Sequence, residues 1–138
     1  MNKKFQIFFY LIIITASLNS EPVKTTLEDY AYDYGKIGYE IGFNATSSYF
    51  LPMDSDSYFN ASDGTYTMEV RLDGLSRSSK REFVPYYNEH CEMTFDDNDC
   101  QLYIEGEVEL DSNMKMILKA NKINFLSQDK SKISKSYN

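Results

Sequence analysis

The clearest hydrophobic pattern in the chain is alternation with a period of two residues. In YTMEVRLDGL, residues 66–75, the apolar side carries Tyr66, Met68, Val70 and Leu72. In CQLYIEGEVEL, residues 100–110, one side carries Leu102, Ile104, Val108 and Leu110, and the other carries Tyr103, Glu105, Glu107 and Glu109. Successive side chains of a strand point to opposite faces, so the pattern predicts a half-buried β-strand in each segment.

The segment MKMILKANKINFL, residues 114–126, also alternates, but its pattern slips by one residue. The apolar side carries Met116, Leu118 and Ala120 and then, after a skipped position, Ile123 and Phe125. A β-bulge near Asn121 explains the slip, because a bulge inserts one unpaired residue into a strand. The alternative that the pattern leaves open is a helix with Met114, Ile117, Leu118 and Phe125 on one side.

Two further segments are predicted to be strands on weaker signals. REFVPYYNE, residues 81–89, is interpreted as a strand that Pro85 confines to a sheet edge or a bulge, because proline cannot donate to a ladder. CEMTF, residues 91–95, is interpreted as the arm that leads into the loop between the two cysteines.

The segment from about 26 to 42 is predicted to be a helix. Thr25-Thr26-Leu27-Glu28 fits a capping box, and apolar residues then recur at helical spacing at Leu27, Tyr30, Ala31, Tyr34, Ile37 and Ile41. Three glycines, Gly35, Gly38 and Gly42, oppose a helix, since each costs about 1 kcal/mol in a helix interior. The alternation of Tyr30, Tyr32 and Tyr34 is equally regular and favours a strand instead.

These elements predict an α+β fold, in which an N-terminal helix precedes a small antiparallel β-sheet or an OB-like barrel of about five strands. Residues 21–126 are long enough for one domain with a modest core. Residues 127–138, rich in lysine and serine, are predicted to be a disordered polar tail.

Residues 1–20 have the layout of a secretory signal peptide. Lys3 and Lys4 precede an apolar run from about Ile7 to Ala16, which is too short to cross a bilayer. Cleavage after Ser17 and cleavage after Ser20 are both compatible with the sequence. We therefore expect a secreted or periplasmic protein without stable membrane insertion after cleavage, in a bacterial or a eukaryotic host.

Export to an oxidising compartment predicts that the chain's two cysteines, Cys91 and Cys100, form a disulfide. His90 lies beside Cys91, but a Cys-His catalytic pair needs a free thiolate. Gly74-Leu75-Ser76-Arg77-Ser78 also lacks the final glycine of a nucleophile elbow. We therefore expect no catalytic residues.

The charge of the chain excludes one class of partner and suggests another. From Glu21 onward there are 21 acidic and 12 basic residues, and residues 21–111 alone hold 20 acidic residues against six basic ones, a net charge of −14. Nucleic-acid binding depends on cations that neutralise phosphates, so no nucleic-acid partner is expected. The composition instead favours a cationic protein or another extracytoplasmic ligand.

Metal and cofactor signals are weak. Asp96, Asp97 and Asp99 offer oxygen ligands for calcium, but the EF-hand spacing fails, because Leu102 and Val108 stand where glycine and glutamate are needed. One histidine and two paired cysteines are too few for zinc. We expect no cofactor. In a eukaryotic host, Asn44 and Asn60 are acceptors for N-glycosylation.

The interpretation that the residues favour is a non-enzymatic binding module with an acidic, tyrosine-rich surface. Its candidate contacts are the polar side chains of the second alternating strand, Tyr103, Glu105, Glu107 and Glu109. The alternatives are an inhibitor of a cationic hydrolase such as lysozyme and, less favoured, a cryptic enzyme that uses paired glutamates.

The exported protein is predicted to have lost about 17 to 20 residues and two hydrogens relative to the reduced full chain, because the signal is cleaved and the cysteines pair. Intact-mass measurement, with and without reductant, checks both events. A retained Met1, or two thiols that alkylate without reductant, would contradict this expectation.

Overall fold

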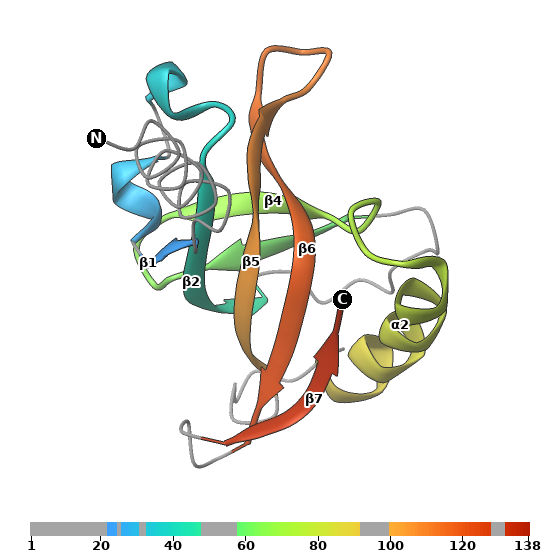
Figure 1. The fold of residues 1–138 in the computed structure, drawn as a ribbon. Coiled ribbons are helices and arrows are strands. Elements are labelled where there is room, and N and C mark those ends of the chain that lie inside the picture. The colour runs from blue at the N-terminus through green and yellow to red at the C-terminus, as the bar shows by residue number, and fades with distance from the viewer. Residues whose placement is uncertain (1–21, 25, 31–32, 48–57, 92–99, 128–131) are drawn as a thin grey trace, which may run out of the picture.

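The alternating segments belong to one sheet that closes on itself (Figure 1). The computed structural model describes residues 22–24, 26–30, 33–47, 58–91, 100–127 and 132–138. The strands of this part are β1 (Val23–Lys24), β2 (Glu40–Ser47), β3 (Tyr58–Ser62), β4 (Thr67–Arg71), β5 (Gln101–Leu110), β6 (Met116–Leu126) and β7 (Ile133–Tyr137). Pairing in the order β2-β3-β4-β6-β5, with β5 paired back to β2, closes a barrel of five strands.

The barrel strands are antiparallel neighbours except for β4 and β6, which pair in parallel. The short strands β1 and β7 lie outside the barrel circuit, β1 parallel to β2 and β7 antiparallel to β6. The described fold is mostly β with one α-helix, so the predicted small barrel of about five strands is confirmed. The predicted position of the helix is wrong.

The hairpin of β5 and β6 has the predicted register. Leu102, Ile104 and Val108 are fully buried inside the barrel. Glu105 pairs with Lys122 and Gly106 pairs with Ala120, so Asn121 is the unpaired extra residue. The prediction of a bulge near Asn121 is confirmed, and the alternative of a helix over this segment is wrong.

Gly106 lies at the point where this hairpin bends. A Cβ atom at Gly106 would lie 2.9 Å from the Cα atom of Ala120 on the opposite strand, closer than real side chains approach. The bulge beside it increases the local twist of β6. The missing side chain and the extra residue together let the two strands curve around the core.

The helix α2 (Arg77–Cys91) occupies the region that was predicted to be a strand at residues 81–89. Phe83, Tyr87 and Cys91 recur every four residues, and all three are buried against the barrel. The hydroxyl of Ser76 accepts a hydrogen bond from the backbone N–H of Ser79, which satisfies one of the free donors at the start of the helix. The spacing of large buried residues thus outweighs the strand signal.

Pro85 lies inside α2, where it removes one backbone hydrogen bond and crowds the preceding turn. Its side chain is exposed, on the side of the helix away from the barrel. An isolated helix pays about 3 kcal/mol for an interior proline, and burial of Phe83 and Tyr87 is of a size that offsets this loss. The proline therefore does not mark a sheet edge.

The predicted helix over residues 26–42 is absent from the described residues of that segment. They form two short 3-10 turns, η1 (Leu27–Asp29) and η2 (Tyr34–Lys36), and then the strand β2. Gly38 has a φ of 90°, which ends any helical path before β2. Pairing of residues 40–46 with β5 therefore outweighs the helical spacing of residues 26–42.

Aromatic rings fill the space between α2 and the barrel. Phe83 is fully buried, and its ring centroid lies 5.9 Å from that of Phe59, 5.6 Å from that of Phe125 and 5.4 Å from that of Tyr137. Tyr87 lies 5.2 Å from Phe59, and its hydroxyl forms a hydrogen bond with that of Ser47. Burial raises the pKa of the Tyr87 hydroxyl, although the bond to Ser47 acts against this. We call Phe59, Phe83, Tyr87, Phe125 and Tyr137 the aromatic cluster.

Two contacts fix the ends of α2 and β7. Cys91, the last residue of α2, forms the predicted disulfide with Cys100, and their Cα atoms are 5.0 Å apart. Tyr137, at the end of β7, is 3% exposed within the aromatic cluster. The predicted disordered tail therefore does not hold for residues 133–137, because pairing with β6 and burial of one tyrosine order them.

The docking of β7 is predicted to depend on Tyr137. Tyr137→Ala should lower the free energy of unfolding by about 3 kcal/mol, the size expected when a buried aromatic ring is deleted. The matched control is Ile133→Ala on the same strand, because Ile133 is 58% exposed and its truncation should stay within about 0.5 kcal/mol. Equal effects of the two changes in urea titrations would contradict the buried position of Tyr137.

Candidate binding face

The outer surface of β2 and β5 holds all four candidate contact residues. Tyr103, Glu105, Glu107 and Glu109 alternate with buried residues along β5, as the sequence predicted, and each is partly exposed. The antiparallel register sets Asn44 opposite Tyr103 and Glu40 opposite Glu107. We call the set of Glu40, Tyr103, Glu105, Glu107 and Glu109 the acidic face.

Tyr103 lies across the neighbouring strand. A Cβ atom added at Gly42 of β2 would collide with the Tyr103 hydroxyl and lie 3.1 Å from Cζ of the ring, so the ring covers a position where β2 has no side chain. Burial, the charge of Glu105 and a hydrogen bond to Glu105 all raise the pKa of the Tyr103 hydroxyl. Tyr103 is therefore a neutral donor to Glu105 at neutral pH, and the hydroxyl end of its ring lies over Gly42 of β2.

The acidic face places like charges at neighbouring positions of the sheet. Glu40 stands directly opposite Glu107, a like-charge pair that disfavours the free sheet. On the other side, the register sets Lys119 opposite Glu107 and Lys122 opposite Glu105. The described residues nevertheless place no cation within ion-pair distance of these glutamates, and the Asn121 amide donates to Glu40 over 3.1 Å.

Three ion pairs between described residues lie where β4 meets the β5–β6 turn. Glu69, only 6% exposed, accepts from Arg71 over 2.9 Å and lies 3.5 Å from the Lys115 ammonium group. Arg71 also lies 3.6 Å from the carboxylate of Asp111. Alternation in residues 66–75 puts Glu69 and Arg71 on the polar side of the strand, which a half-buried strand exposes to solvent. Asp111 and Lys115, which complete this network, are remote in sequence from β4. No local pattern in the sequence therefore predicts it.

A polar hollow of about 320 Å³ lies between η1, β2 and the β3–β4 turn, and it is lined by Thr26, Glu28, Asn44, Asp63 and Thr65. Asp63 already accepts hydrogen bonds from the backbone N–H groups of Leu27, Thr65 and Tyr66, at 2.9 to 3.0 Å. Its carboxylate thus connects η1 to the β3–β4 turn. Asp63, the residue of this hollow with three backbone donors, is thus engaged in holding the fold together.

The other candidate residues are placed as follows. His90 lies near the end of α2, its ring stacked on Tyr86 at 4.0 Å and its Nδ1 atom 2.9 Å from the Tyr86 carbonyl oxygen. Asn44 is exposed on β2, whereas Asn60 on β3 is partly buried. The calcium candidates Asp96, Asp97 and Asp99 and the signal peptide at residues 1–20 lie outside the described residues.

Two further observations concern only the part of the chain that the structure describes. It contains no group of three or more histidine, cysteine, aspartate or glutamate side chains arranged to hold a metal ion. It also contains no helix that combines the length and the apolar character needed to span a membrane.

The stability of the fold is predicted to depend on the ionised form of Asp63. Partial burial alone would raise the pKa of this carboxyl, but the N–H donors of Tyr66, Thr65 and Leu27 together outweigh burial and lower it. A lowered pKa in the folded state means that the stabilisation is complete above the unfolded pKa and is lost as the pH falls below about 4. Asp63→Asn should therefore lower the free energy of unfolding at pH 7 by about 1 to 2 kcal/mol.

The difference between Asp63→Asn and the unsubstituted protein should shrink as the pH is lowered from 6 to 2 in denaturant titrations. Glu89→Gln, at an exposed position of α2, is the control and should change stability by less than about 0.5 kcal/mol. A constant difference across this pH range would show that the Asp63 charge has no part in the effect.

No protein-family model matches the sequence, and no curated protein matches it either. Among solved structures, the hypothetical protein ygiW from E. coli is similar, with 16% sequence identity, coverage of 75% of this chain and 90% of that one, and a TM-score of 0.48.

Proposed function

We propose that this chain is an exported, non-enzymatic binding module whose acidic face engages a cationic protein. The observation that carries the proposal is the pairing of Glu40 with Glu107 across β2 and β5, without an ion pair to either among the described residues. Like charges directly opposite on neighbouring strands destabilise a sheet. A basic side chain from a partner, placed between the two carboxylates, would remove that repulsion on binding.

The rest of the chain supports the same kind of partner. Residues 21–111 carry a net charge of −14, which attracts cationic proteins over long distances and speeds their association. Tyr103 presents a ring fixed against Gly42, so a partner that contacts it orders few additional side-chain rotamers. The disulfide between Cys91 and Cys100 is compatible with a secreted or periplasmic location.

Lysozyme is a suitable first partner, because it is a cationic hydrolase of the kind that an exported acidic domain would block. We expect the association rate of the mature protein with lysozyme to fall markedly between 0.1 M and 1 M salt, since the Debye length falls from about 10 Å to about 3 Å. The triple change Glu105→Gln, Glu107→Gln and Glu109→Gln should slow association at 0.1 M salt by about tenfold. It should not lower the midpoint of thermal unfolding.

The matched control removes three negative charges elsewhere, by Asp73→Asn, Glu82→Gln and Glu89→Gln at exposed positions before and within α2. Both variants have the same net charge, so only the position of the lost charges differs. Surface plasmon resonance over a salt series measures the rates. If the control slows association as much as the acidic-face variant does, the net charge of the chain is responsible and the acidic face is not the site.

A further inference from the structure

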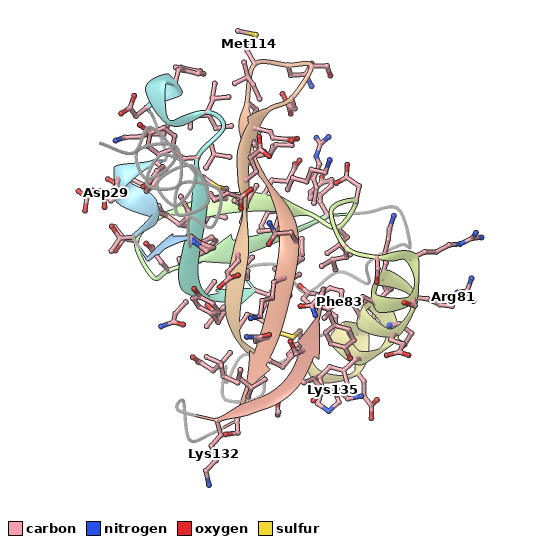
Figure 2. All side chains as sticks on the ribbon, in the orientation of Figure 1. Asp29, Arg81, Phe83, Met114, Lys132 and Lys135 are labelled. Carbon is pink, nitrogen blue, oxygen red and sulfur yellow. A yellow bond between two sulfur atoms is a disulfide. The ribbon has the colours of Figure 1, made fainter. Side chains whose placement is uncertain are left out.

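Three exposed apolar side chains gather on two adjoining loops at one end of the barrel. Tyr34 and Ile37 belong to the η2 turn and are 59% and 38% exposed, and Met114, in the β5–β6 turn, is 64% exposed. The Tyr34 hydroxyl donates a hydrogen bond to the Met114 carbonyl oxygen over 3.3 Å, which joins the two loops. Figure 2 shows Met114 at the far end of the β5–β6 hairpin, pointing away from the barrel. We call these three residues the apolar tip.

The backbone conformation at Met114 is one that a methionine side chain disfavours. Met114 has a φ of 62°, in the left-handed region that glycine and asparagine adopt most readily. The Asp111 carboxylate holds the turn by accepting from the N–H groups of Asn113 and Lys115, at 2.8 and 2.9 Å. Glycine would fit this turn better, and the exposed methionine fills no part of the core.

The charges around the apolar tip distinguish between possible partners. Glu109, of the acidic face, lies two residues before Asp111 on the strand that leads into the turn, and Glu40 follows the η2 segment. Two lysines also lie near the tip: Lys115 pairs with Glu69, and Lys36 lies 5.8 Å and 5.3 Å from the ring centroids of Tyr30 and Tyr39. Residues 33–40 and 109–115, which form the two loops and their flanks, hold four acidic residues against two lysines. The border of the tip is therefore acidic in sum, which fits a cationic protein and disfavours an anionic membrane surface.

We propose that the apolar tip is a second contact for the same cationic protein, which buries Met114 and Tyr34 in an apolar depression next to its basic residues. This inference rests on the proposed function. Methionine and tyrosine suit such a contact, because one adapts its shape and the other brings a large, rigid surface. Charged residues at a rim mainly set the association rate, whereas buried apolar contacts mainly set the dissociation rate.

The test measures stability and binding kinetics on the same variants of the mature protein. Met114→Gly should raise the midpoint of thermal unfolding and accelerate dissociation from lysozyme about tenfold, while the association rate and its salt dependence stay unchanged. Met114→Asn, which also tolerates a positive φ, should accelerate dissociation in the same way. It distinguishes loss of the methionine side chain from the added backbone flexibility that glycine brings. The control Ile133→Ala, at an exposed apolar residue on β7, should leave dissociation unchanged.

The possible outcomes separate the two proposals. Unchanged dissociation in both Met114 variants, with association still slowed by the glutamine substitutions at residues 105, 107 and 109, would overturn the apolar tip and leave the acidic face standing. Binding of no member of a cationic panel of lysozyme, ribonuclease A and cytochrome c would overturn both. Flotation with phosphatidylglycerol vesicles that Met114→Asn abolishes would identify the tip as a membrane contact and overturn its assignment to a protein partner.

Discussion

The curvature of the β5–β6 hairpin is the constraint on which the rest of the structure depends. These are the two longest strands described, and each forms ladders on both of its edges: β5 with β2 and β6, and β6 with β5, β4 and β7. A straight hairpin would not bring β2 and β4 around to close a circuit. The extra residue at Asn121 and the missing side chain at Gly106 allow the bend, and closure leaves the five barrel strands paired on both sides.

Much of the barrel was readable from the sequence because β5 alternates regularly between buried and partly exposed residues. Alternation placed Leu102, Ile104 and Val108 inside, and a slip of one residue in the same pattern located the bulge at Asn121. The disulfide followed from the two cysteines and the expected export. None of these inferences needed knowledge of which distant segments are in contact.

The position of the helix was not readable in the same way. Pro85 suggested a sheet edge, yet Phe83 and Tyr87 form a helix because the barrel offers both of them a site in the aromatic cluster. Residues 26–42 carry helical spacing, yet β2 forms because β5 pairs with it over seven positions. Tyr137 likewise orders a polar segment through contacts with α2 and β6. Tertiary contacts outweigh local propensity in all three places.

The residues of the candidate site likewise differ in whether the sequence predicted them. Four residues of the acidic face, Tyr103, Glu105, Glu107 and Glu109, were predicted as candidates, because exposure on a strand follows from alternation. Glu40, the apolar tip and the network around Glu69 were not predicted, because each depends on segments that are distant in sequence. Both proposed contacts also work against the stability of the free protein: Glu40 faces Glu107, and Met114 occupies a left-handed conformation. The closed barrel, the disulfide and the aromatic cluster tolerate such local losses. The unfavourable features thus lie together at one end and on one face of an otherwise stable barrel. This arrangement is expected of a binding surface, because contact with the partner supplies the stabilisation that the free protein lacks.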